Sequence, residues 1–405
     1  MKKVLTVLVC FSTIFSVRAA NGRLAIINAE LIDGKSDRVQ SGVTVLISDG
    51  KIESVKRGGK VPKDYETIDI AGATLMPGFI DAHTHIRSLS SAKRALESGV
   101  TTVRSASTPN YQDVNLRELV KSGVLSGPDM VAAGVFVTPN LGETVLADPR
   151  LSVLMNGVNS EEELRMLVRI NADRGVDFIK TRGTERAGLP NTDPRKQTYT
   201  QEQLAVIVDE ANKHNIPVMA HAHGDEGGYA AVAAGVKSIE HGTYLSEKTL
   251  KLMKQKGTYL VPTFTTVVDL TEPGGDYDNP VLFIRGQHML SALEKTVKRA
   301  YEIGIKIVTG ADTGYGPNSV TRVGMEITNF VKLGMKPMDA IRSATSVGAE
   351  LLQISDRTGT VTVGKEADLV VVPDNPLEDI RSVQDVVLVI SNGVIAMNRL
   401  PFSKE

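Results

Sequence analysis

The chain has 405 residues, of which 41% are hydrophobic and 23% charged, values typical of a globular protein with a sizeable buried core. Its 46 basic and 47 acidic residues give a formal net charge of −1, so no excess of positive charge indicates a nucleic acid or an anionic membrane as partner. Cys10 is the single cysteine, which excludes an internal disulfide framework.

The first twenty residues follow the pattern of an export signal. Two lysines precede an apolar run over residues 4–17, and small residues follow it. This pattern predicts a signal peptide over residues 1–19 and a periplasmic or secreted mature protein. A membrane anchor is the alternative, but the run is interrupted by polar residues and is shorter than the roughly 20 residues that a spanning helix needs. Cleavage removes three basic residues and no acidic one, which changes the formal charge from −1 to −4.

Both ends of the mature chain alternate short apolar runs with turn residues. Asp49-Gly50 near the start and Asn392-Gly393 near the end are dipeptides typical of hairpin turns. We therefore expect residues 20–77 and 358–405 to form one small β-sandwich domain from both ends of the chain.

Residues 78–357 alternate strand patterns with amphipathic helix patterns. Helices are expected to begin after the N-capping residues Ser160 and Thr200. The predicted strands are 79–85, 101–107, 129–137, 177–183, 217–223, 238–244, 258–264 and 306–312. Eight strands that alternate with helices predict an α/β fold of the (β/α)8 TIM-barrel type. An open doubly wound sheet is the competing fold, but no GxGxxG motif follows the first strand.

Polar side chains stand at the carboxyl ends of several predicted strands. His83 and His85, in "GFIDAHTHI", are two residues apart and therefore share a face of the first strand. Other strands carry polar residues at the same level: Lys180, His221, His223, His241 and Asp312. In a barrel these ends meet around one axis, so we expect the side chains to converge on one site.

The chemistry of this set points to metal ions. Imidazole and carboxylate ligands suit zinc, with manganese, cobalt or iron as further options. An ammonium group cannot bind metal, but burial lowers the pKa of a lysine, and the free amine of Lys180 can add carbon dioxide to form a carbamate that bridges two ions. The alternative for Lys180 is a salt bridge to Asp312 in a barrel without metal.

The order HxH, Lys, His, His and Asp along the strands resembles the binuclear amidohydrolase superfamily. The flanking segments agree over nearly the whole mature chain: "LMPGFIDAHTH", "TTVR", "DFIK", "HAHG", "SIEHGTY", "TGADT", "AIRSATSVGAELL" and "GTVTVGKEADLVVV". The details are most similar to the imidazolonepropionase-like, prolidase-type (Xaa-Pro dipeptidase-like) branch. The resemblance implies two divalent ions, foremost zinc, held by these ligands: His83, His85, carboxylated Lys180, His221, His241 and Asp312.

Some assignments stay open within this resemblance. His221 and His223 share a face; the family pattern favours His221 as the ligand and His223 as a residue near the substrate. Tyr244 is a candidate for a hydrogen bond to the substrate or for packing. Arg182 and Arg186 are candidates for binding a carboxylate or are solvated loop charges. A Gly-Gly-His element common in this branch is absent after the third strand, so the resemblance does not fix substrate recognition.

These features predict a metal-dependent hydrolase of a C–N amide bond in a small molecule, foremost a dipeptide or an N-acyl amino acid. A hydroxide that bridges two ions would attack the carbonyl, and Asp312 would act as general base and then as general acid. One alternative is a cyclic amide or heterocycle amidohydrolase or deaminase, against which Lys180 argues. Another is a non-catalytic binding protein on the same barrel, against which the complete ligand set argues. A homo-oligomer is compatible with the sequence.

Overall fold

The computed structural model describes residues 22–400. The predicted signal peptide, residues 1–19, lies outside the described residues. Within residues 22–400, no helix combines the length and the apolar character needed to cross a membrane.

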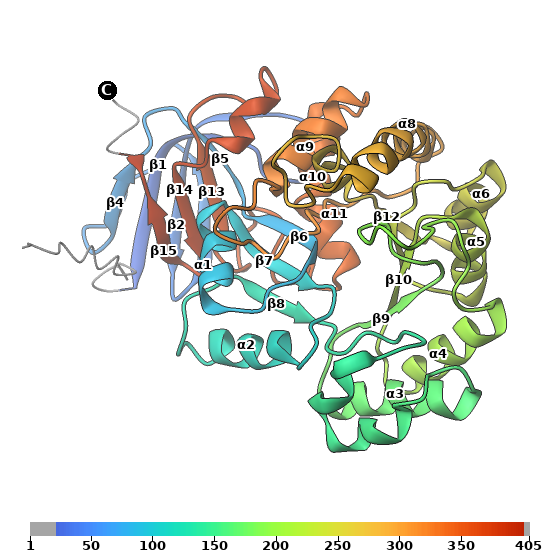
Figure 1. The fold of residues 1–405 in the computed structure, drawn as a ribbon. Helices are drawn as coiled ribbons and strands as arrows, with labels where there is room; N and C mark the ends of the chain where they lie inside the picture. Colours follow the sequence, from blue (N-terminus) through green and yellow to red (C-terminus); the bar gives the residue numbers. More distant parts are fainter. Residues whose placement is uncertain (1–21, 401–405) are drawn as a thin grey trace, which may run out of the picture.

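The centre of the molecule is a barrel of parallel strands, as the sequence predicts (Figure 1). Seven regular strands form two sheets: β6 (Phe79–Thr84), β7 (Val100–Ser105) and β8 (Asp129–Ala132), and then β9 (Ile179–Arg182), β10 (Val218–Ala222), β11 (Ser238–His241) and β12 (Tyr259–Val261). A parallel bridge from Val137 to Thr181 connects the two sheets. The segment 306–313 takes the eighth position, with bridges from Ile307 to Leu260 and from Thr313 to Thr84.

The expected eighth strand, 306–312, is therefore not a regular strand but an extended segment with isolated bridges. A Cβ atom on Gly310 would lie 2.8 Å from Cβ of His83, so this backbone runs directly against the first strand. Asp312 then takes a positive φ of 43°, which ends the extended conformation. Strands β8 and β12 also end earlier than predicted, because Gly134 and Thr263 adopt left-handed conformations.

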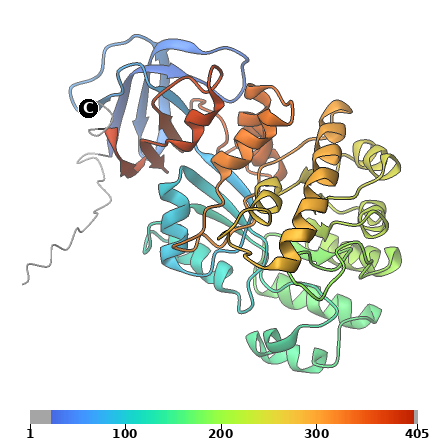
Figure 2. The same cartoon turned by 45° about the horizontal axis from the view of Figure 1, so that its top comes forward.

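Helices surround the barrel (Figure 2). Their bounds are α1 (Leu89–Glu97), α2 (Gln112–Lys121), α3 (Glu161–Asp173), α4 (Gln201–Lys213), α5 (Asp225–Ala234), α6 (Glu247–Lys256), α7 (Phe264–Asp269), α8 (Pro280–Glu302), α9 (Val323–Lys332), α10 (Pro337–Ser343) and α11 (Ser346–Leu351). Short 3-10 helices lie at η1 (Gly142–Ala147), η2 (Pro149–Leu154) and η3 (Ile380–Gln384). The predicted caps of α3 and α4 are confirmed: Ser160 and Thr200 each form a capping box with the residue three positions on.

Strands from both ends of the chain form one mixed sheet beside the barrel (Figure 1). It joins β1 (Arg23–Leu31), β2 (Gln40–Ser48), β3 (Lys51–Arg57), β4 (Glu66–Asp69) and β5 (Thr74–Pro77) with β13 (Leu369–Val372), β14 (Leu388–Ser391) and β15 (Val394–Asn398). The central pairing is between β5 and β13, which are almost 300 residues apart in sequence. Both predicted hairpin dipeptides connect neighbouring antiparallel strands of this sheet. Many of its apolar residues form a hydrophobic cluster of their own, and others join the large cluster of the barrel.

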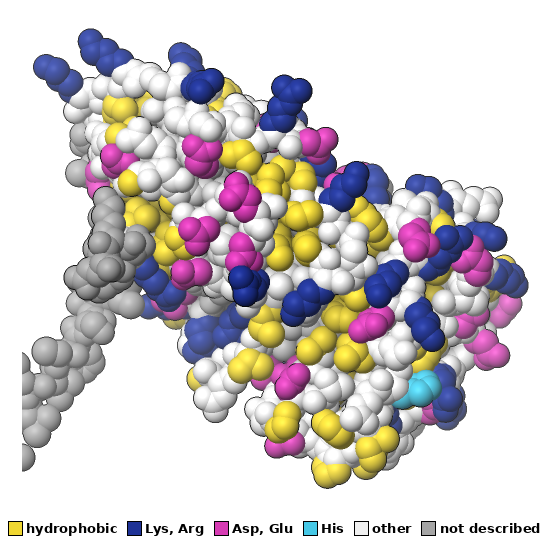
Figure 3. All heavy atoms as spheres, turned by 90° about the horizontal axis from the view of Figure 1, so that it is seen from above, with side chains coloured by type: hydrophobic (Ala, Val, Ile, Leu, Met, Phe, Trp, Pro, Cys, Tyr) yellow, Lys and Arg dark blue, Asp and Glu magenta, His cyan; other side chains and the backbone are white. Residues whose placement is uncertain are grey.

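The charged side chains on the face seen in Figure 3 are of both signs and are mixed rather than sorted into one patch. This distribution agrees with the small formal net charge of the chain. It gives no electrostatic reason to expect a polyanion on this face.

Candidate metal centre

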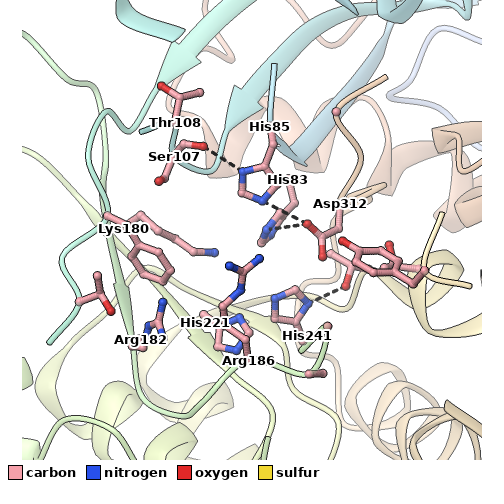
Figure 4. Close-up of a pocket in the computed structure, with 18 of the residues that line it drawn as sticks. His83, His85, Ser107, Thr108, Lys180, Arg182, Arg186, His221, His241 and Asp312 are labelled. Atoms are coloured by element: carbon pink, nitrogen blue, oxygen red, sulfur yellow. Dashed lines mark hydrogen bonds and ion pairs between the residues drawn. The ribbon is translucent and has the colours of Figure 1, made fainter. Parts of the chain in front are cut away.

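A cavity of about 580 Å³ opens at the carboxyl ends of the barrel strands. Seven candidates from the sequence line it: His83, His85, Lys180, His221, His223, His241 and Asp312. Figure 4 shows the labelled members of this set, from widely separated parts of the sequence, around one central space. The structure thus brings together the residues that sequence reasoning placed at the strand ends.

His83, His85 and Asp312 form the first cluster of possible metal ligands, with their ligand atoms all within 4.8 Å of one another. Oδ1 of Asp312 lies 3.2 Å from Nε2 of His85 and 3.5 Å from Nε2 of His83. The backbone N–H of Asp312 donates to the carbonyl of His83 at 2.8 Å, which fixes the segment 306–313 against β6. Three ligands from two adjacent segments can hold one ion.

Two contacts orient the imidazoles of the first cluster. Nδ1 of His83 lies 2.6 Å from Oε2 of Glu240, and Nδ1 of His85 lies 2.9 Å from the carbonyl of Ser107. Each acceptor holds the proton on Nδ1 and leaves Nε2 free for a metal ion. Arg104 donates to both oxygens of Glu240, at 2.9 and 3.1 Å, and so neutralises the buried carboxylate.

His221, His223 and His241 form a second cluster of possible ligands within 4.8 Å. Nδ1 of His223 lies 2.8 Å from the hydroxyl of Thr243, and Nδ1 of His241 lies 2.7 Å from that of Thr263. These are side-chain contacts of the kind that orient ligands. His221 differs, since its Nε2 lies 3.0 Å from the carbonyl of Glu185. The structure places both His221 and His223 beside His241 and does not select one as the ligand.

The two clusters adjoin each other. The ring centroids of His83 and His241 are 5.0 Å apart, although the two residues belong to different clusters. This closeness is compatible with two ions that share ligands, since the ions of two-metal sites are about 3.5–4 Å apart.

Lys180 lies in β9 with only 2% of its surface exposed, and its Nζ has no hydrogen-bond partner within residues 22–400. Among the described residues it forms no salt bridge to Asp312, so the structure does not show the alternative that the sequence left open. Burial lowers the pKa of its ammonium to about 8. An unpaired buried amine is costly. A ligand on this nitrogen, or a carbamate formed from it, would satisfy it.

The protonation states of the candidate ligands suit metal ions. Burial lowers the pKa of His83 to about 4 and that of His223 to about 3, so both rings are neutral at neutral pH, as metal ligands must be. Burial alone would raise the pKa of Asp312, but His83 and His85 lower it below its usual range and keep the carboxylate ionised. The residues present therefore fit divalent metal ions.

The candidates for substrate binding separate into two groups. Arg182 and Arg186 line the cavity, on the wall next to Lys180 and His221 (Figure 4). Tyr244 is not among the residues that line it; its hydroxyl lies 3.0 Å from Nδ1 of His288. The structure thus brings the two arginines and His223 to the site but does not bring Tyr244 there.

Sequence reasoning missed Glu240 and Arg104. Strand alternation places Glu240 and its neighbour His241 on opposite faces. His241 has a positive φ of 76°, and this break in the strand lets both side chains reach the inside of the barrel. Arg104 stands in the quoted "TTVR" segment, and a charged residue inside this predicted strand could have drawn attention to a paired carboxylate.

Comparison with known proteins places these features in context. A model described as "Amidohydrolase family" matches residues 74–396. The crystal structure of a Xaa-Pro dipeptidase with bound methionine in the active site is 31% identical, with a TM-score of 0.82, and the match covers 92% of this chain and 99% of that one. A putative prolidase from Bifidobacterium longum is 29% identical, with a TM-score of 0.81 and coverage of 93% and 94%. Ochratoxinase from Aspergillus niger is 27% identical over 401 residues, which cover 88% of this chain and 82% of the ochratoxinase.

Proposed function

The chain belongs to the amidohydrolase family. We propose that it hydrolyses the amide bond of dipeptides or N-acyl amino acids with two bound divalent metal ions. One observation carries the proposal. The two ligand clusters, the unpaired amine of Lys180 and the carboxylate of Asp312 all face one cavity. Relatives that are a dipeptidase and a prolidase support the choice of substrate class.

Bound metal ions would supply an activated water and polarise the scissile carbonyl. His83, His85, His221, His241 and Asp312 would hold them, together with a carbamate on Lys180, and zinc is the metal that we propose. The histidines can do so because their buried rings are neutral, and Lys180 because burial leaves much of its amine available to carbon dioxide near pH 8.

Asp312 has the position and charge of the proton carrier in this proposal. Its carboxylate stays ionised and lies beside both histidines of the first cluster. It would accept the proton of the attacking water and deliver it to the amide nitrogen. The nitrogen needs this proton because an amide anion is a very poor leaving group. Asp312 would thus act as general base and then as general acid.

Export completes the proposal. We propose that residues 1–19 direct the chain out of the cytoplasm and are removed, which leaves a periplasmic or secreted enzyme. The mass of the protein recovered from the periplasm or the medium would test this, because cleavage after Ala19 gives a defined mature N-terminus.

A substrate screen tests the proposed activity. The protein is loaded with zinc and offered a panel of dipeptides, N-acetyl amino acids, cyclic amides and amino-heterocycles, while the metal content is counted. We expect two ions per chain and hydrolysis confined to the dipeptides or N-acetyl amino acids. Turnover of cyclic amides or heterocycles with one ion per chain would instead support the heterocycle amidohydrolase. No turnover of any compound by fully loaded protein would support a binding protein.

A further inference from the structure

None of the three arginines that line the cavity, Arg87, Arg182 and Arg186, has a carboxylate within ion-pair distance among the described residues. Arginines elsewhere, such as Arg104 and Arg357, do pair with acids. Nε of Arg182 is buried and makes no hydrogen bond. Arg182 as a whole is half-buried. Because a buried N–H without an acceptor is unfavourable, a ligand that supplies an acceptor best explains the position of this Nε.

The place of Arg182 on β9 relates it to the metal centre. It is two residues beyond Lys180 on the same strand, so both side chains leave the same face, and their Cα atoms are about 6.8 Å apart along it. In the backbone register of the sheet, Arg182 also lies opposite His221 of the neighbouring strand β10. In an N-acyl amino acid, the nitrogen and the α-carbon separate the scissile carbonyl from the free carboxylate. A substrate whose scissile carbonyl lies near Lys180 can therefore direct its carboxylate toward Arg182, the next residue on the same face of β9.

Beside Arg182, an aromatic ring rather than an acidic side chain contacts the guanidinium. The guanidinium carbon lies 4.4 Å from the ring centroid of Phe136, and Nζ of Lys180 lies 5.8 Å from the same centroid. A cation–π contact orients the guanidinium but leaves its charge in place. The one acid near in sequence, Glu185, points elsewhere: it pairs with Lys196 at 2.9 Å and accepts the N–H of Asp193 at 3.0 Å.

The cavity as a whole is short of negative charge. Of the described residues that line it, three are arginines, Arg87, Arg182 and Arg186, and Asp312 is the only acidic one. Since we assign Asp312 to the metal ions, no carboxylate of the cavity remains to neutralise the arginines. The cavity therefore selects for an anionic ligand.

The loop that carries Arg186 is held in place. Arg285 on α8 donates to the backbone carbonyls of Ala187, Leu189, Pro190 and Thr192. On the other side, the ring of Tyr277 lies against Gly188, where a Cβ atom would be only 3.1 Å from it. Arg186 is therefore presented by a preorganised loop, which reduces the entropic cost of binding a ligand.

We propose that Arg182 and Arg186 form the subsite for a free carboxylate of the substrate, next to the scissile amide. This inference rests on the proposed function and deepens it, since it restricts the substrate to amides with a free carboxylate on the amine side. Arg182 supplies the half-buried part of the subsite on β9, and the exposed Arg186 completes it from the loop. Two guanidinium groups can bind one carboxylate through several charge-assisted hydrogen bonds.

The test compares two substrates on several variants. The substrates are the best-cleaved compound of the panel and the same compound with its carboxylate replaced by a carboxamide. We expect the zinc-loaded wild type to prefer the acid by about 100-fold in kcat/KM. Arg182→Gln should lower kcat/KM for the acid by about 100-fold, mainly through KM, but that for the carboxamide by less than about threefold. Arg182→Lys should recover only part of the loss, because an ammonium cannot bind bidentately.

The control is Arg381→Gln, which removes an exposed arginine that pairs with Asp379 and does not line the cavity. Arg381→Gln should leave kcat/KM unchanged for both the acid and the carboxamide. All variants should keep the metal content and melting temperature of the wild type. Equal hydrolysis of acid and carboxamide by the wild type would overturn the subsite while leaving the proposed hydrolase intact. So would an equal loss of both activities in Arg182→Gln.

Calorimetry tests the subsite even if no compound is cleaved, an outcome that would refute the proposed function alone. The zinc-loaded protein is titrated with the N-acetyl amino acids of the panel and with their carboxamides. Binding of the acids that is at least tenfold tighter, and that is lost in Arg182→Gln, would support the subsite. Equal binding of acids and carboxamides, or no binding of either, would overturn it.

Discussion

Nδ1 of His83 lies 2.6 Å from the carboxylate of Glu240, and the two residues are 157 positions apart in the sequence. Both are buried, and Arg104 neutralises the carboxylate with two hydrogen bonds. Burial alone would raise the pKa of Glu240, but Arg104 and His83 lower it to about 2, so the acceptor is an anion at every working pH. Glu240 is therefore a positioning residue that keeps Nε2 of His83 directed at the metal centre.

Removing this contact should weaken metal binding without removing a ligand. Glu240→Leu alone leaves the buried guanidinium of Arg104 unpaired, which should lower the free energy of unfolding by about 3–5 kcal/mol. The double variant with Arg104→Met should recover most of that stability, since neither charge remains. Its zinc affinity, measured by competition with a chromophoric chelator, should still be about 10–100-fold below that of the wild type.

The single variant Arg104→Met is the matched control, because it keeps the contact between His83 and Glu240. It should bind zinc more tightly than the double variant. Wild-type affinity in the double variant would show that Glu240 serves the stability of the barrel and not the orientation of His83.

Asp312→Asn should separate metal binding from catalysis. The amide keeps the shape of the side chain and one oxygen ligand, so we expect most of the bound metal to remain. It cannot take up a proton near neutral pH, so kcat for the substrate identified in the screen should fall by at least about 100-fold. Turnover and metal content are measured on the same preparation. Near-normal kcat in a fully loaded variant would contradict the role of Asp312 as general base.

Whether Lys180 carries a carbamate can be tested by the effect of bicarbonate on the metal content of the protein. Metal-free protein is reconstituted with zinc in buffers purged of carbon dioxide, with and without added bicarbonate. If Lys180 binds as a carbamate, bicarbonate should raise the metal content from about one to about two ions per chain. Lys180→Met should stay near one ion in both buffers. Two ions per chain without any carbon dioxide would contradict the carbamate.

The barrel and the main part of the metal site could be predicted because each rests on a local pattern. The segment around His83 and His85, for example, has the sequence pattern of a buried strand with two polar residues at its end. The parallel topology brings such ends together. The hairpin at Asn392-Gly393 is likewise set by its own two residues, both of which have a positive φ.

The remaining features depend on contacts between distant segments. Asp312 leaves the strand conformation because Gly310 lies against His83, more than 200 positions earlier in the sequence. His241 reaches the barrel interior beside Glu240 only because it takes a left-handed conformation. The roles of Arg182 and Tyr244 could not be separated in the sequence, because each stands near the carboxyl end of a predicted strand. The structure shows that Arg182 lines the cavity and Tyr244 does not.

Asp368 should make the stability of the protein depend on pH. It is 3% exposed, and burial, with repulsion from Asp129, raises the pKa of its carboxyl to about 7. A carboxyl with a raised pKa in the folded state contributes stability that is complete below its unfolded pKa of about 4 and is lost as pH rises through 7. The loss is about 1.4 kcal/mol per pH unit between these values.

Asp368→Asn should therefore flatten the fall in melting temperature between pH 5 and pH 8, because an amide does not titrate. Thermal unfolding of both proteins over this range measures the effect. Asp385→Asn, at an exposed position, is the control and should follow the wild type. Parallel curves for wild type and Asp368→Asn would show that Asp368 does not titrate in this range.

Arg285 should determine the order of the loop that carries Arg186. Arg285→Met removes the donor to four backbone carbonyls of residues 187–192, which should destabilise this loop by on the order of 2 kcal/mol. Amide hydrogen exchange in the loop should then be about 10–100-fold faster, and KM for the carboxylate substrate should rise by about tenfold. The melting temperature should change little, since the loop lies at the rim of the cavity. Arg299→Met, on the same helix as Arg285, removes an exposed ion pair with Glu247 of α6 and should alter neither the exchange rate nor KM. Unchanged exchange in Arg285→Met would mean that the packing of Tyr277 on Gly188 suffices to hold the loop.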